Sequence, residues 1–251
     1  MPEWTLIFAL AVFAFLLAGF VKGVIGMGLP TITVGVLSLV LSPAEAVALM
    51  LVPSFVTNVW QGLAGPHFRA IMRRLWPTLL GLCAGTWIAP LIGVGFLTPE
   101  AATRGRITLG VTLVVYAVLG LFKVRFHLRA GAEPWLGPIV GVATGILSAA
   151  TGVYMIPAIP YYQAIGLEKD ALVQTQGVSY TVSTVALAVL LLSNGVLHTS
   201  NATLSAAAVL PAILGMVLGQ HIRARVRPEV FRLCFYLGML ALGAHLALLH
   251  R

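Results

Sequence analysis

The chain has 251 residues, of which 59% are hydrophobic and only 9% are charged. Soluble domains carry roughly 25% charged residues, so this composition excludes a soluble globular domain and predicts that lipid is the solvent. The formal net charge of +8 does not indicate nucleic-acid binding, because the basic residues lie in short breaks between apolar segments. Such positive breaks mark the cytoplasmic side of a membrane protein.

Ten apolar segments, five in each half of the chain, predict helices embedded in a membrane. The first five cover residues 4–21, 29–41, 44–63, 76–97 and 107–122. After a basic break, the other five cover residues 135–149, 153–165, 171–192, 204–222 and 230–249. The expected organisation is a first transmembrane repeat over residues 1–122, a cytoplasmic linker over 123–134 and a second transmembrane repeat over 135–251.

The second segment of each half is short. Residues 29–41 reach only about 20 Å at 1.5 Å per residue, against a hydrocarbon core of about 30 Å. Small and polar residues that permit a backbone turn occur at matching places: Gly23, Gly26, Gly28 and Pro30 in the first half, and Ser148, Thr151, Gly152 and Pro157 in the second. We therefore expect each half to contain a broken or re-entrant helix hairpin, a feature that points to the binding site of a transporter.

Two matching stretches indicate that the halves are copies of each other. Residues 76–85 read WPTLLGLCAG and residues 210–219 read LPAILGMVLG, so that one proline, one leucine and two glycines recur in register. Downstream, the sequence Thr-Pro-Glu at 98–100 is answered by Arg-Pro-Glu at 227–229. Self-similarity of this kind predicts an internal duplication.

The charges of the breaks predict that the copies have opposite orientations. The break over residues 65–75 holds three arginines, whereas its counterpart over 198–203 holds no lysine or arginine. The next pair differs in the opposite sense, since 98–106 is nearly balanced and 223–232 holds four arginines against one glutamate. Because positive breaks remain cytoplasmic, the prediction is an all-α, polytopic bundle of two inverted five-segment repeats, with both termini outside.

The two broken hairpins suggest a binding site for a small anion. A helix that begins inside the membrane presents free backbone N–H groups and a positive dipole end. We expect two such N-termini, near Gly28–Thr31 and near Thr151–Tyr154, to meet across the pseudo-two-fold axis. The alternative is that the glycines only permit close helix packing.

Two charged residues are candidates for a role in transport. Lys22 lies at the end of an apolar run, where an ionisable group usually faces a cavity and would attract an anion; the alternative is a lysine that extends to the membrane surface. Glu45 follows Ser42-Pro43-Ala44, which is typical of a helix N-terminal cap. A proton-coupling carboxylate is the other interpretation of Glu45.

Polar side chains within apolar helices need partners, so they face the protein interior or a wet cavity. They either bind oxygen atoms of a substrate or hold helices together. The expected substrate-binding set is Lys22, Gly23, Gly26, Gly28, Thr31, Asn58, Gln61, Ser148, Thr151, Gln176, Ser179 and Tyr180. No set of catalytic residues and no metal-ligand spacing is recognisable, so we expect no enzyme activity, no cofactor and no metal.

Three stretches resemble the TauE/SafE family of sulfite and organosulfonate exporters, also called TSUP. They are Gly19-Phe-Val-Lys-Gly-Val-Ile-Gly-Met-Gly-Leu-Pro30, Ser42-Pro-Ala-Glu-Ala46 and the segment Pro53–Asn58. The resemblance implies a multi-pass carrier of the bacterial inner membrane that exports sulfite or organosulfonates such as sulfoacetate.

The leading hypothesis is an exporter linked to the proton-motive force, in which one repeat rocks against the other in alternating access. Its expected partners are a small anionic substrate and the lipid bilayer. We expect no nucleic acid to bind, and whether the protein forms a homodimer is left open. An anion channel and a membrane-embedded enzyme are the alternatives.

Overall fold

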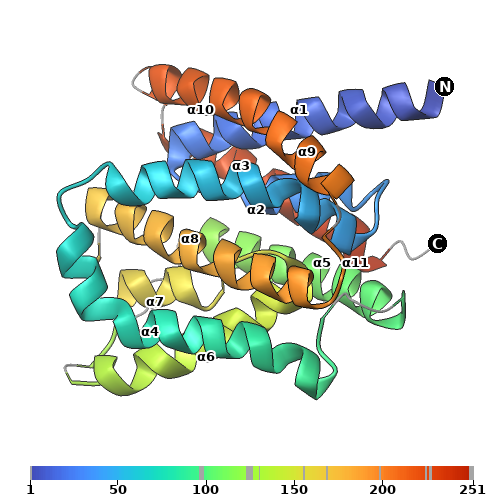
Figure 1. The fold of residues 1–251 in the computed structure, drawn as a ribbon. Coiled ribbons are helices and arrows are strands. Elements are labelled where there is room, and N and C mark those ends of the chain that lie inside the picture. The colour runs from blue at the N-terminus through green and yellow to red at the C-terminus, as the bar shows by residue number, and fades with distance from the viewer. Residues whose placement is uncertain are drawn as a thin grey trace.

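The computed structural model describes residues 2–95, 99–122, 127–129, 131–154, 156–167, 169–197, 199–223, 225 and 228–248, and its regular elements are all helical (Figure 1). The first half contains α1 (Pro2–Ile25), α2 (Leu29–Leu37), α3 (Pro43–Leu63), α4 (Phe68–Ile88), the 3-10 helix η1 (Ala89–Ile92) and α5 (Pro99–Leu121). The second half contains α6 (Glu133–Thr151), α7 (Ala158–Ala164), α8 (Lys169–Ser193), α9 (Thr199–Ala207), α10 (Val209–Arg223) and α11 (Pro228–Leu248). The predicted all-α class is confirmed.

Eight helical segments of the described residues are long and apolar enough to cross a membrane. They include one segment from each of the helices α1, α3, α4, α5, α6, α8 and α11, and one that joins α9 to α10. The helices α2 and α7 have nine and seven residues, too few to cross about 30 Å of hydrocarbon. The chain is therefore a multi-pass membrane protein, and the two segments predicted to be short are short.

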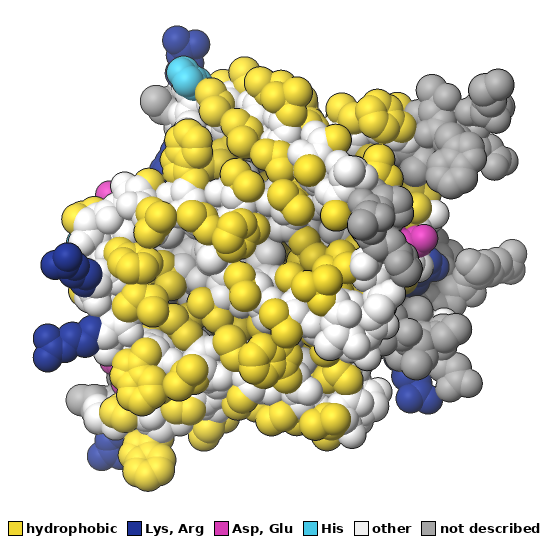
Figure 2. Space-filling view, in the orientation of Figure 1, with side chains coloured by type: hydrophobic (Ala, Val, Ile, Leu, Met, Phe, Trp, Pro, Cys, Tyr) yellow, Lys and Arg dark blue, Asp and Glu magenta, His cyan; other side chains and the backbone are white. Residues whose placement is uncertain are grey.

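Apolar side chains cover the outside of the bundle, and polar ones are enclosed in it. Leu91, Trp135 and Phe122 are about as exposed as side chains can be, at 83%, 79% and 77%, and hydrophobic side chains cover the face shown in Figure 2, with lysine and arginine at its rims. Several amides and hydroxyls are instead fully buried, among them Asn58 and Gln176. This distribution suits lipid outside and hydrogen-bonding groups inside.

Glycines bring two helix pairs into backbone contact, and each pair joins one half of the chain to the other. A Cβ atom on Gly19 of α1 would lie 2.1 Å from the carbonyl oxygen of Ala212 on α10, and one on Gly215 would lie 2.1 Å from that of Leu16. In the second pair, a Cβ atom on Gly85 of α4 would lie 2.1 Å from the carbonyl oxygen of Val142 on α6. Small residues allow this approach in membranes, where packing rather than hydrophobic burial holds helices together.

We expect Gly85→Ala to lower the free energy of unfolding by at least about 2 kcal/mol, because the added methyl group meets backbone that cannot move aside. Gly238→Ala is the control, since a Cβ atom there has no neighbour within 4 Å. Thermal unfolding of both variants in detergent micelles checks the prediction. Equal melting temperatures for the two variants would contradict it.

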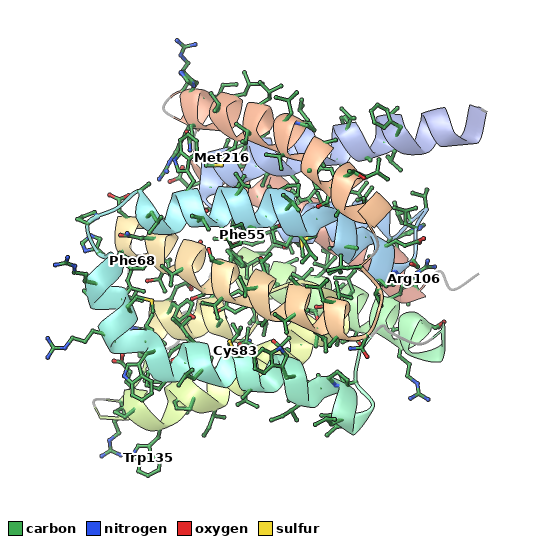
Figure 3. All side chains as sticks on the ribbon, viewed as in Figure 1. Phe55, Phe68, Cys83, Arg106, Trp135 and Met216 are labelled. Carbon is green, nitrogen blue, oxygen red and sulfur yellow. The ribbon has the colours of Figure 1, made fainter. Side chains whose placement is uncertain are left out.

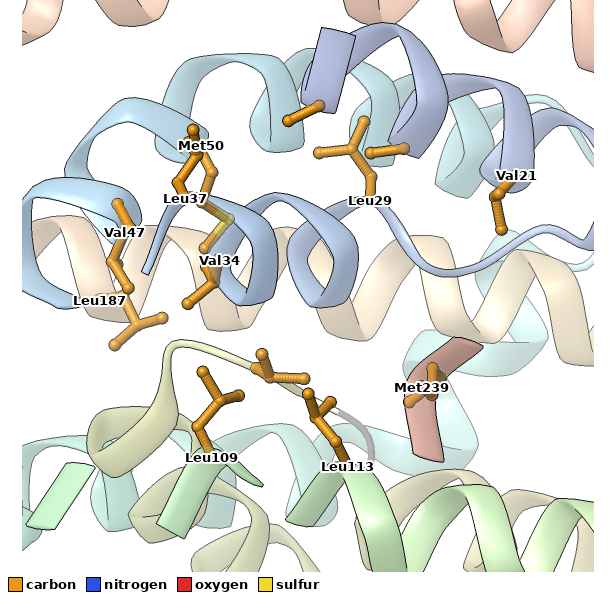
Figure 4. Packing of buried hydrophobic residues seen from close by; sticks show 14 of the residues in the cluster. Val21, Leu29, Val34, Leu37, Val47, Met50, Leu109, Leu113, Leu187 and Met239 are labelled. Atoms are coloured by element: carbon orange, nitrogen blue, oxygen red, sulfur yellow. The ribbon is translucent and has the colours of Figure 1, made fainter. Parts of the chain in front are cut away.

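The remaining long helices also pair across the two halves of the chain. The helices α3 and α8 pack together, as do α5 and α11. At the first crossing Gly62 lies against Gly177, and at the second Gly110 lies against Gly243. An apolar core fills the space around α2, where Leu29, Val34 and Leu37 are fully buried (Figure 4).

The two ends of the bundle differ in their polar contacts. At the end marked by Phe68 and Trp135, Arg74 of α4 forms an ion pair with Glu133 of α6, with Nε and Oε1 2.7 Å apart (Figure 3). At the opposite end, Arg106 donates a hydrogen bond to the carbonyl oxygen of Leu41. The first turn of α1 and the last turn of α11 both lie at the Arg106 end (Figure 1).

The apolar segment predicted to begin at residue 76 belongs to a helix that begins earlier, inside the polar break over residues 65–75. The helix α4 begins at Phe68, so Arg69, Arg73 and Arg74 lie on its first two turns and only residues 64–67 are non-helical. Arginine is a good helix former, and its long side chain can extend from a helix toward the aqueous phase. A charged turn at the end of an apolar helix cannot be told from a loop by polarity alone.

Candidate anion-binding site

The chain reverses direction after α1 through two glycines in left-handed conformations. Gly26 has φ 81° and Gly28 has φ 110°, which residues with a Cβ atom rarely adopt, and α2 begins at the next residue, Leu29. Nε2 of Gln61 donates hydrogen bonds to the carbonyl oxygens of Gly26, at 2.9 Å, and Val173, at 2.7 Å. Gln61, which we predicted to bind substrate, thus uses its amide N–H groups to hold this turn against α8.

Lys22 lies one turn before this bend and is enclosed by the protein, with 3% of its surface exposed. Its ammonium group donates hydrogen bonds to Oγ1 of Thr57, at 3.1 Å, and to Oδ1 of Asn58. The hydroxyl of Thr57 itself donates to the carbonyl oxygen of Pro53, at 2.8 Å, so that its lone pairs can accept from Lys22. Lys22 is thus buried inside the bundle and within the apolar span Phe8–Ile25, and its contacts come from α3.

Pro53 lies inside α3 and interrupts its backbone hydrogen bonding. A proline inside a helix leaves the carbonyl group four residues before it without its helical partner, and here that group belongs to Leu49. Ser205 of α9 donates to the carbonyl oxygen of Leu49 at 2.8 Å and accepts a hydrogen bond from the backbone N–H of Val52 at 3.1 Å. The second half of the chain thus stabilises the turn that precedes Thr57.

Several polar atoms of the described residues are buried without any hydrogen-bond partner. They are Nδ2 of Asn58, both side-chain polar atoms of Gln176, Oη of Tyr180, Oγ1 of Thr175 and Oγ of Ser38. Buried polar groups in native proteins are nearly always paired, and an unpaired one costs about 1–3 kcal/mol. The atoms on α3 and α8 therefore indicate a place where a polar ligand completes the hydrogen bonding.

The crossing of α3 and α8 brings these atoms to one level. The backbone N–H of Gly62 lies close to Gly177, and Nε2 of Gln174 donates to the carbonyl oxygens of Gly62 and Gly65, a register in which the two helices run antiparallel. One turn before Gly62 lies Asn58, and one turn after Gly177 lies Tyr180. Gln176 stands beside the crossing itself, on the same helical stripe as Tyr180.

Four other predicted or neighbouring hydroxyl residues of the second half, Ser148, Thr151, Tyr162 and Ser179, are paired within the protein. The hydroxyl of Tyr162 is hydrogen bonded to those of Tyr154, at 2.7 Å, and Ser179, at 2.8 Å. Ser148 is bonded to Ser183 at 2.9 Å. Thr151 donates to the carbonyl oxygen of Leu147 at 2.7 Å. Ser148, Thr151 and Ser179, all predicted to bind substrate, thus have partners inside the bundle in this conformation.

The prediction of a second helix N-terminus near Thr151–Tyr154 was wrong. Thr151 is the last residue of α6, Gly152 follows with φ 70°, and the chain resumes a helix only at Ala158 in the seven-residue α7. The two glycine bends also do not meet in the middle of the bundle. Gly26 is bonded to Gln61, whereas Gly152 lies against Val47, and these two residues of α3 are about 21 Å apart at 1.5 Å per residue.

Two more predicted residues of the first half have structural surroundings. A Cβ atom on Gly23 would lie 2.2 Å from the carbonyl oxygen of Met216, so this glycine permits the contact between α1 and α10, the alternative that we had weighed. Thr31 is buried in the first turn of α2.

Glu45 forms a capping box, which confirms the capping interpretation. Oγ of Ser42 accepts a hydrogen bond from the backbone N–H of Glu45, and the carboxylate of Glu45 accepts one from the backbone N–H of Ser42 at 3.0 Å. Glu45 is exposed and stands thirteen residues before Asn58. It is not part of the Lys22 cluster.

We expect Glu45→Ala to lower the free energy of unfolding by about 1 kcal/mol, through loss of the cap, and to leave substrate affinity unchanged. Glu45→Gln is the matched control, because glutamine also closes a capping box. Thermal unfolding and ligand binding of the purified variants check this. A loss of binding in Glu45→Gln would instead give the carboxylate a role in transport.

A surface depression in the described residues borders the contacts of Lys22, because Thr57 is among its lining residues. It is a groove between α3 and α10, with Val56, Thr57, Trp60 and Met216 among its lining residues. Its lining is almost entirely apolar, which suits a lipid chain rather than an anion. The site is therefore defined by buried polar atoms and not by an open pocket.

The described residues form an all-helical bundle with eight apolar spans, and a lysine inside it is bonded to neutral oxygens. These features define a multi-pass membrane protein with a polar site in its interior. Residues 11–246 match the family model described as sulfite exporter TauE/SafE. The chain belongs to this family, and membership implies a membrane exporter of sulfite or a related anion. No curated protein and no solved structure matches the chain.

Proposed function

We propose that this protein exports sulfite or a small organosulfonate, such as sulfoacetate, across the bacterial inner membrane. The observation that carries the proposal is the combination of the Lys22 ammonium with unpaired donors on Asn58, Gln176 and Tyr180. Sulfite and sulfonate groups are negatively charged and present three oxygen atoms that only accept hydrogen bonds. A site made of donors therefore matches their chemistry, and hydrogen bonds to an ionised group are the strong ones.

We further propose that the two halves are inverted repeats. The packing supports this: if each helix is exchanged for its counterpart in the other half, the pair of α1 and α10 becomes the pair of α6 and α4. The pairs of α3 with α8 and of α5 with α11 are unchanged by the exchange. Both of the exchanged pairs also use glycines at the contact. In this proposal the Phe68 end is cytoplasmic, because Arg69, Arg73 and Arg74 lie there, and both termini are outside.

Transport by alternating access requires two bodies that move around the site. The pairs of α1 with α10 and of α4 with α6 each have backbone contacts at four glycines, against two at the crossing of α3 and α8, which argues that these two pairs stay together and that whole repeats do not move apart. We propose instead that one body contains α1, α2, α3 and α10, and the other contains α4, α6, α7 and α8. The crossing of α3 and α8 lies between these bodies, beside the unpaired polar atoms. The membrane potential, negative inside, favours outward movement of an anion.

The test is transport in reconstituted vesicles. Proteoliposomes loaded with labelled sulfite or sulfoacetate should release the anion in a saturable manner, and unlabelled anion outside should accelerate the release by exchange. Vesicles with Asn58→Leu protein should show neither property. Unsaturable flux at single-channel rates would support a channel instead, and the absence of flux for both anions in either mode would refute the proposal.

A further inference from the structure

We propose that Lys22 carries one proton across the membrane with each exported anion. It binds the anion as an ammonium ion and passes through the empty protein as a neutral amine. The inference rests on the proposed function, because it assigns a second role to the same site.

The first observation is that Lys22 is buried without a counter-ion among the residues that the structure describes. Its two hydrogen-bond acceptors, Thr57 Oγ1 and Asn58 Oδ1, are both neutral. An ammonium group enclosed in this way is stable only when an anion sits beside it, and otherwise it is relieved of its cost by giving up its proton. The amine that remains keeps two N–H donors and can still bond to both oxygens.

The second observation is that the acidic residues lie at helix starts, where they complement the helix dipole. By sequence position each is in the first turn of a helix or directly before it: Glu3, Glu45, Glu100, Glu133, Glu168, Asp170 and Glu229. Among the described side chains, the buried polar and charged set contains threonines, serines, amides and Lys22 but no carboxylate. The usual proton carriers of transporters, aspartate and glutamate, are thus not found next to the unpaired atoms.

Tyr180 of α8 is a titratable group that we place at the same site as Lys22, and the helices packed around Lys22 carry the following others. On its own helix, Glu3 is nineteen residues away, and α2 has no titratable residue. On α3 the titratable residue is Glu45, which is exposed, and on α10 they are His221 and Arg223 at the last turn. On α11 the titratable groups are Glu229, Arg232, Cys234, Tyr236 and His245. Four of these five are exposed, and Tyr236 packs against Tyr116.

The proton balance follows from these contacts. On the cytoplasmic side, the amine of Lys22 takes a proton from water on its nitrogen lone pair, and the ammonium ion pairs with the incoming anion. The loaded site then opens outward, the anion leaves, and the ammonium ion returns its proton to water. The empty protein closes again with Lys22 neutral. Each cycle moves one proton and one anion in the same direction.

Charge movement makes this cycle measurable. Sulfoacetate carries two negative charges, so its export with one proton moves one net negative charge. At equal pH and a potential of 100 mV, the limiting concentration ratio is then about fiftyfold, whereas two net charges would give about 2,400-fold. Vesicles with a potassium diffusion potential set by valinomycin, and with an external pH dye, provide both quantities. We expect about one proton per anion and the smaller ratio.

Lys22→Arg separates proton carriage from binding. It keeps a positive charge that cannot be released, so it should retain exchange of sulfoacetate for sulfoacetate and lose net efflux and proton movement. Asn58→Asp places a permanent counter-ion beside Lys22 at a residue of the binding site itself, so it should abolish anion binding and proton movement together. Asn194→Asp, at an exposed position at the end of α8, is the matched control and should keep the wild-type proton ratio.

If a variant does not transport, calorimetry of the purified protein can still measure the protons taken up when the anion binds. Titration with sulfoacetate at pH 8.5, in two buffers that differ in ionisation enthalpy, should show proton uptake on binding for wild type and none for Lys22→Arg. Anion efflux without protons in wild type, or undiminished proton uptake in Lys22→Arg, would overturn the inference and leave the exporter intact. If wild-type protein moves neither sulfite nor sulfoacetate in any mode, it is the proposed function that fails.

Discussion

Replacement of Lys22 by methionine should raise the melting temperature of the purified protein and lower its affinity for sulfite or sulfoacetate by at least about thirtyfold. The loss follows from removal of a buried charge that contacts the anion, which is worth about 2 kcal/mol or more. The melting temperature should rise, although the affinity falls, because Lys22 is enclosed and lacks an acidic partner among the described residues. An apolar side chain of similar length fits such a place without the cost of desolvating an ammonium group.

A rise in melting temperature together with a fall in affinity distinguishes this prediction from a general disturbance of the fold, which would lower both the melting temperature and the affinity. Arg73→Met is the control, because Arg73 is exposed on the second turn of α4 and should affect neither. Differential scanning fluorimetry and equilibrium binding in detergent measure the two quantities. A Lys22→Met protein that binds sulfite as wild type does would remove Lys22 from the site.

Two glutamines of α8, two residues apart, should respond to the same substitution in opposite directions. Both polar atoms of the Gln176 side chain are buried and unpaired. Gln174 donates to the carbonyl oxygens of Gly62 and Gly65 and accepts from the backbone N–H of His67. Gln176→Met should therefore stabilise the empty protein by about 1–3 kcal/mol, and Gln174→Met should destabilise it by a similar amount.

Transport adds a second contrast between the two variants. Gln176→Met should reduce the rate of sulfite efflux from vesicles at least tenfold, because the amide no longer meets the anion, which corresponds to about 1.4 kcal/mol. Gln174→Met should leave the affinity of the folded fraction unchanged. If Gln176→Met lowers stability, its amide has a partner in the empty protein and does not belong to the binding site.

The architecture could be predicted from the sequence to the extent that it depends on hydrophobicity and chain length. Long apolar runs became long helices, and the run over 29–41 became the short α2. The start of α4 could not be located, because its first turns carry arginines that also occur in loops. The separation of the two glycine bends could not be predicted either. It depends on the depth in the bundle at which α1 and α6 end, as the contacts of Gly26 and Gly152 show.

The candidate site could be predicted where a residue is unusual for its surroundings. Lys22 is conspicuous as a charge in an apolar run, and Asn58 as an amide in one. Thr57 escaped notice because threonine is common in membrane helices, although its position four residues after Pro53 was a usable signal. Gln61, Gln174 and Gln176 look alike in sequence, and only the packing of α3 on α8 determines which amide has backbone partners.

The contacts of α1 with α10 and of α4 with α6, which join the two halves of the chain, also have a consequence for the synthesis of this protein. While the ribosome is still synthesising α5, α1 and α4 are already in the bilayer, but the backbones that they contact, on α10 and α6, do not yet exist. The glycine-lined faces of α1 and α4 must therefore remain in contact with lipid until α6 and α10 have been synthesised. Assembly into the native bundle can finish only when α10 emerges, so neither half, produced as a separate polypeptide, has the partners to complete its own fold.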